Sequence, residues 1–272
     1  MSFIFDVIKE MRIKQWTKNL FVFSAPLFHG TLFEMSHFIP TCITFIAFSF
    51  LSSSVYFIND IFDIEKDKLN PKKRNRPISQ GKISVKFAYI FATILFLFSM
   101  LISYSVNLYI VPLLLSYFII NVLYSIRLKH IVIIDVFIIA YGFIARAFSG
   151  AIATDITLTP WFLLCVFFLS LFLALGKRRY ELNEISENKI EEGRQVLKFY
   201  SKELIDQLTT IVSSSLIICY ALFTMDKNTQ NNNLLPFTIP LVIYGLFYYL
   251  YLVRVKKEGG APDELLYKAR PI

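Results

Sequence analysis

The sequence predicts an all-α fold, a polytopic bundle of transmembrane helices with charged cap loops at its cytoplasmic end. Apolar residues make up 56% of the 272 residues, which is more than a soluble domain of this length carries. Most of the apolar runs are long enough to cross a hydrocarbon core of ~30 Å at ~1.5 Å per residue. The charged residues gather between these runs, as they do in a chain that crosses a membrane several times.

The apolar runs give about eight expected spans. The first run is short and contains Pro26, so this span is expected to be tilted or broken. The runs lie near residues 20–33, 38–58, 87–104, 107–126, 131–153, 160–176, 207–224 and 235–253.

The basic residues indicate the orientation of the chain. Of its 28 Lys and Arg residues, only Lys227 falls in an odd-numbered connection between spans. The positive-inside rule therefore places the even-numbered connections and both termini in the cytoplasm. The net charge of +8 follows from this bias and favours anionic lipids and substrates, and nothing in it points to nucleic acid.

Residues 1–272 are expected to form a single integral-membrane domain. In residues 1–18, apolar side chains recur at helical spacing among charged ones, which predicts an interfacial helix on the cytoplasmic leaflet. The connections 59–86 and 177–206 are long and charged, whereas the outer connections are short. Function is therefore expected to concentrate in these two cytoplasmic loops.

An acidic motif follows the second expected span directly. Asp60, Asp63 and Asp67 stand at positions i, i+3 and i+7, with Asn59 just before them. On a helix this spacing stacks the three carboxylates on one face, where they repel each other. A divalent cation would relieve the repulsion, and carboxylate oxygens together with a substrate phosphate suit Mg²⁺.

Basic residues follow the acidic motif. Lys72, Lys73, Arg74 and Arg76 could hold the phosphate that the cation would bridge. A solvated, charged loop at a helix end is the alternative for the basic run alone. For the acidic motif that alternative is weak, because the positive-inside bias does not call for acids. The combination predicts a diphosphate site at the membrane surface.

Polar residues also occur within the spans. Arg146 lies eleven residues after Asp135, almost three helical turns, so the two share a face of the expected helix over 131–153. A charge at that depth must face a cavity or a partner, and a structural ion pair is the alternative to a binding role. Tyr124 and Lys129 near the end of the fourth span are candidate binding residues, or ordinary interfacial anchors.

The chain resembles the UbiA superfamily of intramembrane prenyltransferases, whose first aspartate-rich motif is similar to Asn59-Asp60-x-x-Asp63-x-x-x-Asp67 followed by Arg76-Pro77-Ile78 and Gly81. Within that superfamily it resembles the decaprenyl-phosphate phosphoribosyltransferase branch. The segments that carry this second resemblance are Arg12-Ile-Lys14-Gln15-Trp16-Thr-Lys18-Asn19, Arg146-Ala-Phe-Ser-Gly150, and Trp161 through Gly176-Lys177-Arg178-Arg179-Tyr180-Glu181.

The resemblance implies transfer of 5-phosphoribosyl from phosphoribosyl diphosphate (PRPP) to a polyprenyl phosphate, with release of diphosphate. It implies that Asn59, Asp60, Asp63 and Asp67 hold Mg²⁺, for which Mn²⁺ is a substitute, and that Asn59, Asp60 and Asp63 are catalytic. It also implies a multi-pass protein of a prokaryotic inner membrane with its active site in the cytoplasm. A homo-oligomer is left open.

The remaining candidate residues divide between the two substrates. We assign to the donor the residues that lie near the acidic motif or at the cytoplasmic end of a span. Headgroup depth or burial in a span assigns the other set to the acceptor. The donor set is Lys73, Arg74, Arg76, Tyr124, Lys129, Lys177 and Arg178, and the acceptor set is Lys14, Gln15, Lys18 and Arg146.

Two alternative functions remain. A prenyltransferase would use a prenyl diphosphate at the same site, but the second Asp-x-x-x-Asp motif of that class is not cleanly present after the fourth span. A transporter is more remote, because internal repeats are not evident. The family typically has nine spans and this chain reaches Ile272 where a ninth would begin, so a missing ninth span is an expectation too.

Overall fold

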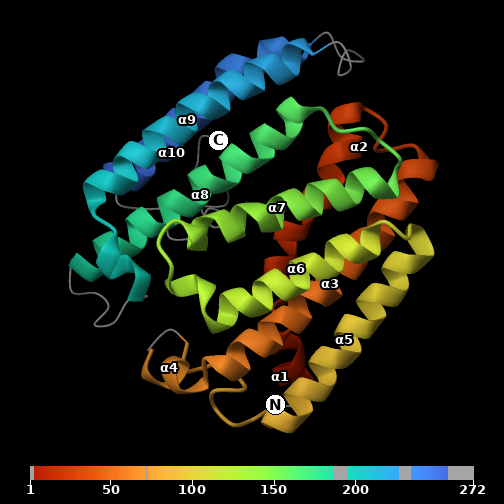
Figure 1. Ribbon diagram of the computed structural model, residues 1–272, viewed down its shortest axis with the longest axis vertical. Coiled ribbons are helices and arrows are strands. Elements are labelled where there is room, and N and C mark those ends of the chain that lie inside the picture. The colour runs from red at the N-terminus through yellow and green to blue at the C-terminus, as the bar shows by residue number, and fades with distance from the viewer. Residues whose placement is uncertain (1–2, 71–72, 187–194, 227–233, 257–272) are drawn as a thin grey trace. The chain divides into compact units, whose positions relative to one another are not determined.

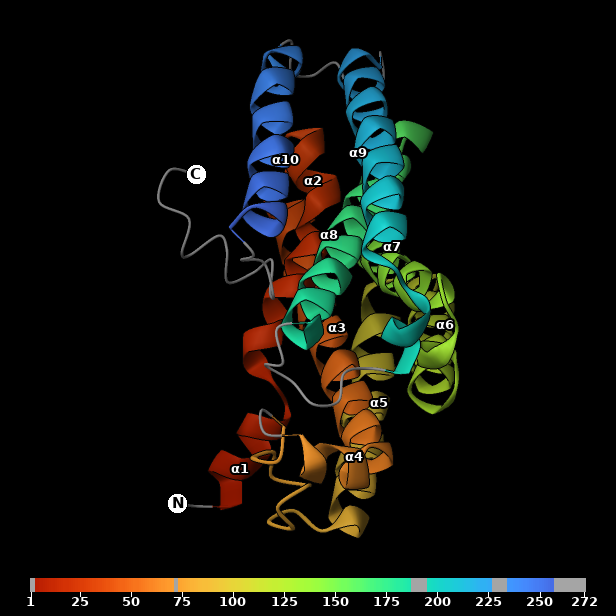
Figure 2. The ribbon, with the colours of Figure 1, turned by 90° about the vertical axis from the view of Figure 1, so that its left-hand side faces the viewer.

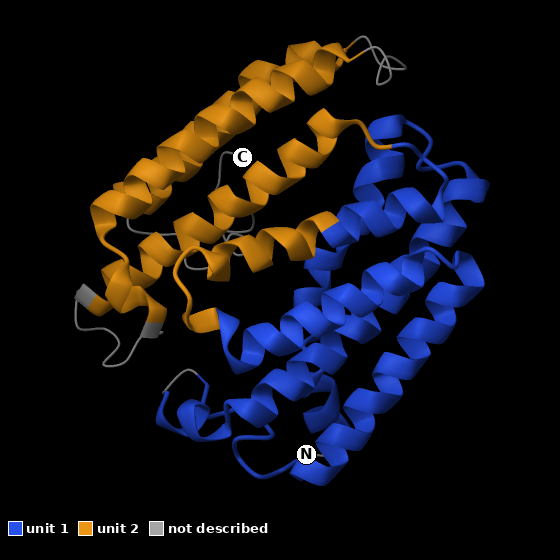
Figure 3. Ribbon diagram, viewed as in Figure 1, with its two compact units in different colours: residues 1–128, 145–157 blue, residues 129–144, 158–272 orange. Residues whose placement is uncertain are grey.

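The computed structural model describes residues 3–70, 73–186, 195–226 and 234–256. Within these ranges the regular elements are all helices, so the predicted all-α class is confirmed (Figure 1). The chain divides into two compact units that each combine two segments (Figure 3). The expectation of a single domain stays a prediction. Unit 1 holds residues 1–128 and 145–157, and unit 2 holds residues 129–144 and 158–272.

Unit 1 is built around one long helix, α3, which packs against η1, α5 and α6. Its elements are α1 (Phe3–Glu10), η1 (Ile13–Phe23), α2 (Ser24–His29), α3 (Met35–Phe62), α4 (Ile64–Leu69), α5 (Val85–Val106), α6 (Ile110–Ile126) and the C-terminal part of α7 (Ile134–Ala153).

Hydroxyl groups join α3 to α5. The Ser54 hydroxyl donates to the carbonyl oxygen of Ala92 at 2.8 Å, and the Ser99 hydroxyl donates to that of Ala47 at 2.7 Å. Small side chains let the two backbones approach closely, and in a bilayer these interhelical hydrogen bonds replace the hydrophobic driving force that water would supply.

The first expected span, 20–33, does not form a continuous helix. A 3₁₀ segment, η1, is followed by the short α2, which ends at Gly30 with φ of +83°. Neither is long enough to be a candidate span. The physical reason lies in the polar side chains of η1, which bond sideways to α3: Asn19 Nδ2 donates to Ser49 Oγ at 3.0 Å and to Ser52 Oγ at 3.2 Å.

Gly150 lets η1 lie directly against α7. A Cβ atom at this position would stand 1.9 Å from the carbonyl oxygen of Val22, so only glycine fits the contact. The sequence segment that begins at Arg146 therefore contains a packing residue as well as a charged one.

The expected loop 59–86 contains a helix end, a short helix and a turn-rich stretch. α3 ends at Phe62, and Asp63 occupies its C-terminal cap before α4 begins. The three aspartates of the motif therefore do not share one continuous helix, contrary to the stripe that their spacing predicts. α5 begins after Ser84, whose hydroxyl accepts a hydrogen bond from the N–H of Phe87 at 3.3 Å.

In unit 2, α8, α9 and α10 pack along one another (Figures 1 and 2). α8 runs ten residues beyond the expected end of its span at 176, so Lys177 and Arg178 extend from a helix and not from a loop. The elements of unit 2 are the N-terminal part of α7, α8 (Pro160–Ser186), η3 (Gln195–Phe199), α9 (Lys202–Met225), η5 (Leu235–Thr238) and α10 (Ile239–Arg254). The short η2 (Leu128–His130) stands where the chain passes between the units.

Six of the described helices are long and apolar enough to cross a membrane: α3, α5, α7, α8, α9 and the η5–α10 segment. The helix α6 is apolar but shorter. Seven of the eight expected runs therefore correspond to helices, and the run at 20–33 is the exception.

Candidate functional site

Asp60 is the centre of a buried ionic cluster in unit 1. Its side chain is 0% exposed at the end of α3. Arg12 donates through Nη2 to both carboxylate oxygens, and Arg76 Nη1 donates to Oδ1 at 2.9 Å. Asn59 Nδ2 also donates to Oδ1, at 3.2 Å. Asp60 is thus held as a carboxylate between two guanidinium groups.

Asp67 joins the same cluster from α4. The nitrogen of Arg76 that contacts Asp60 also donates to Asp67 Oδ2 at 2.5 Å, and Lys73 Nζ lies 3.8 Å from Asp67 Oδ1. Burial raises the pKa of Asp67, while the charges of Arg76 and Lys73 pull it back. One cationic nitrogen therefore bridges two buried carboxylates.

Glu10 adds a third buried carboxyl group, from the end of α1. It is 1% exposed, and neither of its oxygens has a hydrogen-bond partner of ordinary geometry among the described residues. Burial, and next the Asp60 carboxylate against which it lies, raises the pKa of Glu10 to about 9. With this pKa, Glu10 keeps its proton near neutral pH. We call Glu10, Arg12, Asp60, Asp67 and Arg76 the Asp60 cluster.

The sequence interpretation missed two members of this cluster. Arg12 and Glu10 were interpreted as charged residues of the interfacial helix over 1–18, and Arg12 also as part of a family segment, but neither was predicted to be a site residue. Arg12 adopts a left-handed backbone conformation with φ of +52°, which turns its side chain toward Asp60 and over the ring of Tyr56, 4.8 Å from the ring centre. Strain of this kind in a non-glycine residue is typical of functional sites. The acid–arginine pair flanking Met11 is the signal that could have pointed to them.

The four expected Mg²⁺ ligands are not assembled together. Asp60 and Asp67 converge on Arg76, Asn59 donates to Asp60, and Asp63 lies half-buried at the α3 cap, so the ligand roles of Asn59 and Asp63 stay predictions. Across the described part of the chain, no three Asp, Glu, His or Cys side chains form a ready metal-binding group. The converging pair nevertheless fits Mg²⁺, which usually takes one or two carboxylates with water and substrate phosphate, and the bridging Arg76 nitrogen marks a place for positive charge.

The other expected residues of unit 1 are dispersed. Lys14 is exposed on η1, while Gln15 and Lys18 are half-buried there. Arg74 is exposed two residues before Arg76, and Tyr124 is half-buried on α6. Their assignments to donor or acceptor stay predictions.

Arg146 is enclosed within unit 1. Its Nε donates to Asn19 Oδ1 at 2.8 Å and its Nη2 donates to the Tyr117 hydroxyl at 3.0 Å. The guanidinium also lies over the rings of Phe48 and Tyr117, at 4.9 Å and 5.1 Å from their centres. These contacts tie η1, α6 and α7 together, so Arg146 has a structural role in addition to its predicted contact with the acceptor.

Unit 2 holds a second buried ionic cluster, formed by Asp135, Arg178, Glu181 and Tyr200, which we call the Asp135 cluster. Arg178 Nε donates to Asp135 Oδ2 at 2.7 Å, and Nη1 donates to Glu181 Oε2 at 2.8 Å. The Tyr200 hydroxyl donates to Asp135 Oδ1 at 2.8 Å, and burial raises the pKa of that hydroxyl. Lys177 and Lys129 are half-buried nearby in the sequence, and their predicted donor contacts stay untested.

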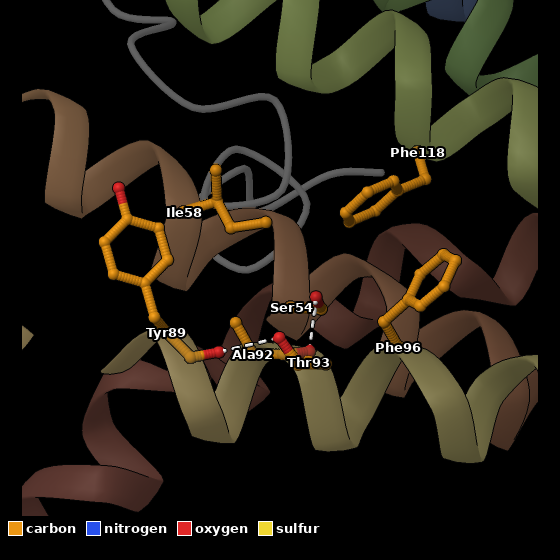
Figure 4. A pocket seen from close by; sticks show the side chains of 7 residues that line it. All are labelled: Ser54, Ile58, Tyr89, Ala92, Thr93, Phe96 and Phe118. Atoms are coloured by element: carbon orange, nitrogen blue, oxygen red, sulfur yellow. Dashed lines mark hydrogen bonds between the residues drawn. The ribbon is translucent and has the colours of Figure 1, made fainter. Parts of the chain in front are cut away.

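A pocket of about 210 Å³ opens among α3, α5 and α6 of unit 1 (Figure 4). Its walls are apolar apart from the hydroxyl groups of Ser54, Tyr89 and Thr93, and those of Ser54 and Thr93 donate to backbone carbonyls. Ile58 lines it from α3, and Asp60, two residues later on the same helix, points to the opposite side. The pocket suits hydrocarbon and lies apart from the Asp60 cluster. The lining residues are Ser54, Ile58, Tyr89, Ala92, Thr93, Phe96 and Phe118.

Comparisons with known proteins show the family of this chain. A profile described as the UbiA prenyltransferase family matches residues 23–266. The decaprenyl-phosphate phosphoribosyltransferase of Mycolicibacterium smegmatis is 32% identical, over 99% of this chain and 88% of the relative. Its counterpart from Corynebacterium glutamicum is 34% identical, over 95% of this chain and 80% of the relative.

Solved structures share the fold. A UbiA homolog from Archaeoglobus fulgidus bound to DMAPP and Mg²⁺ superposes with a TM-score of 0.78 at 18% identity, over 97% of this chain and 93% of that chain. The family profile and the near full-length relatives together confirm the resemblance that the aspartate motif carries. This chain is a transferase that belongs to the UbiA prenyltransferase family.

Proposed function

We propose that this protein transfers 5-phosphoribosyl from PRPP to a polyprenyl phosphate and releases diphosphate, with Mg²⁺, at the cytoplasmic face of the membrane. The observation that carries the proposal is identity of 29–34% over at least 90% of the chain to proteins named decaprenyl-phosphate phosphoribosyltransferase. The Asp60 cluster supports it, because it combines buried carboxylates with two partly exposed arginines.

In the proposed reaction, an oxygen of the polyprenyl phosphate forms a bond to C1 of the ribose. The bond from C1 to the diphosphate oxygen breaks, and the diphosphate leaves with the electron pair. The acceptor phosphate is already an anionic nucleophile near neutral pH, so the site needs no strong general base. The chain's task is to position two anions and to stabilise the leaving one.

The residues of unit 1 divide this task. Asp60 and Asp67 would hold Mg²⁺, which supplies positive charge to the departing diphosphate. Arg76, with Lys73 and Arg74 beside it, would contact the donor phosphates. Lys14, Gln15 and Lys18 on η1 would contact the acceptor phosphate, and the apolar pocket of Figure 4 offers room for part of an isoprenoid chain.

The proposal is tested with purified protein in lipid nanodiscs, incubated with PRPP, MgCl₂ and a polyprenyl phosphate. The expected product is a lipid-linked phosphoribose, detected by mass spectrometry, that is absent when EDTA replaces MgCl₂. A parallel reaction replaces PRPP with a prenyl diphosphate and offers an aromatic acceptor. Product in that reaction alone would overturn the proposal in favour of prenyl transfer.

A further inference from the structure

Arg76 occupies the position that a metal ion would need. Its Nη1 lies 2.9 Å from Asp60 Oδ1 and 2.5 Å from Asp67 Oδ2, and these carboxylates are 0% and 2% exposed. A divalent cation held by Asp60 and Asp67 would need their carboxylate oxygens, which Arg76 now occupies. The guanidinium and the ion cannot share this space, and their like charges repel.

The two arginines of the cluster differ in how firmly they are held. Arg12 contacts both oxygens of Asp60, lies over Tyr56, and comes from a strained backbone position. Among the described residues the Arg76 guanidinium contacts only the two carboxylates, and its side chain is 23% exposed. Arg76 is therefore the arginine that can turn away.

The backbone around Arg76 is anchored while its side chain has room to move. The N–H of Arg76 donates to the Lys73 carbonyl at 3.0 Å, and its own carbonyl accepts from Gln80 at 2.9 Å. Ile78, two residues later, is buried in the core of unit 1. A rotation of the side chain alone would release the carboxylates without moving α3 or α4.

We propose that Arg76 competes with a bare divalent cation for Asp60 and Asp67, and moves onto a phosphate oxygen when the cation arrives with a diphosphate. An arginine can bind phosphate through two parallel hydrogen bonds, so the lost carboxylate contacts are replaced. Arg76 thereby makes the cation and the diphosphate bind cooperatively. When neither is bound, Arg76 neutralises the two carboxylates. The identity of the diphosphate donor rests on the proposed function. The competition between Arg76 and the cation is argued from the contacts of Arg76 alone.

The test measures Mn²⁺ binding to the purified full-length protein in nanodiscs by electron paramagnetic resonance, with and without inorganic diphosphate. In the wild type, diphosphate is expected to tighten Mn²⁺ binding by about tenfold. Arg76→Gln should bind Mn²⁺ alone about five- to tenfold more tightly than the wild type and lose most of the tightening by diphosphate.

The matched control is Lys82→Gln, which removes the same charge from an exposed side chain of the same connection. It should leave Mn²⁺ affinity within about twofold of the wild type, as expected for a screened surface charge. A second variant, Arg76→Lys, keeps the charge and should give an intermediate Mn²⁺ affinity, which protects the test if Arg76→Gln does not fold.

The inference is overturned if neither Arg76 variant binds Mn²⁺ more tightly than Lys82→Gln, or if Arg76→Gln keeps the full effect of diphosphate. The Mn²⁺ measurement uses neither PRPP nor a polyprenyl phosphate. Failure of the transfer assay would therefore overturn the proposed function without changing this result, and failure here would leave the transfer reaction standing.

Discussion

The two buried ionic clusters of this chain differ in their access to solvent. In the Asp60 cluster the arginine side chains are 22% and 23% exposed, and three carboxyl groups meet two guanidinium groups. In the Asp135 cluster both Arg178 and Asp135 are 0% exposed, and Tyr200 caps the remaining carboxylate oxygen. A partly exposed arginine such as Arg76 can exchange its carboxylate partners for a ligand, whereas the fully buried pair of Arg178 and Asp135 is suited to holding the fold together.

The comparison also separates two roles that a buried charged residue can have in a membrane protein, ligand binding and structural support. Both clusters were marked by residues that are costly in a bilayer. Only the accompanying contacts tell them apart: three carboxyl groups lie around two partly exposed arginines in unit 1, whereas one fully buried arginine is shared by two acids in unit 2. The first arrangement is suited to binding, and the second to bracing α7 against α8.

The largest expected effect comes from Asp60→Asn. This change removes a carboxylate from the proposed cation site and should lower the rate of phosphoribosyl transfer by about 10³-fold or more. Thermal unfolding in detergent should change little, because Arg12 and Arg76 remain partly hydrated. A variant that keeps a tenth of the wild-type rate would show that Asp60 is not a site residue.

Asp135→Asn should chiefly reduce stability, by about 3 kcal/mol, because it removes the buried carboxylate that Arg178 Nε contacts and leaves the guanidinium with the carboxylate of Glu181. Chemical unfolding followed by near-UV circular dichroism measures this, with Asp206→Asn as a control at a partly exposed ion pair. Arg178→Lys should likewise lose stability, because lysine cannot reach Asp135 and Glu181 together. If Arg178→Lys instead keeps wild-type stability and raises the KM for PRPP, the donor assignment of Arg178 is correct and the bracing role is wrong.

Glu10→Gln should stabilise the protein increasingly as pH rises. The pKa of Glu10 is raised in the folded state to about 9 from an ordinary 4.5, so the folded protein holds a proton that the unfolded chain releases, and stability falls as pH rises between those values. Glutamine keeps the shape and a hydrogen-bond donor without this dependence. At pH 8 the gain in unfolding free energy should exceed about 1 kcal/mol, and at pH 4 it should vanish. Equal effects at both pH values would contradict a neutral Glu10.

The smallest expected effects are changes in KM that distinguish residues contacting the donor from residues contacting the acceptor. Lys18→Gln is expected to raise the KM for the polyprenyl phosphate about three- to tenfold and to leave that for PRPP nearly unchanged, while Arg76→Gln does the reverse. Initial rates with each substrate varied in turn measure both constants. If both variants alter only the PRPP constant, the acceptor phosphate lies elsewhere.

Much of the fold follows from the sequence because helix length in a bilayer is set by simple dimensions. Seven apolar runs appear as helices, and the charged motif lies at the end of α3 as its spacing predicts. The run at 20–33 was expected to be tilted or broken, and it is broken into η1 and α2. Hydropathy alone did not reveal that neither piece is a span, because it counts side chains one by one. It does not register that Asn19 bonds to serines of α3, or that Gly150 admits η1 at close range.

The composition of the site was only partly predictable. Periodicity predicted one stripe of Asp60, Asp63 and Asp67, but α3 ends before Asp63, so the stripe is interrupted and the role of Asp63 as a metal ligand stays a prediction. Arg12 and Glu10 reach Asp60 from fifty residues away through a turn with a left-handed residue, a contact that local spacing does not reveal. Long-range contacts of this kind need coordinates.

The serine-rich interior of α3 has a consequence for how the protein is made. α3 is less apolar than α5 and yet more buried, and its hydroxyl-bearing face finds hydrogen-bond partners on η1 and α5. Left alone among lipid tails during synthesis, α3 would expose those groups, whereas α5 is apolar enough to stay in lipid by itself. The insertion of α3 is therefore expected to become more stable once α5 has been translated through Val106, because its Ala92 carbonyl then accepts the hydrogen bond of Ser54.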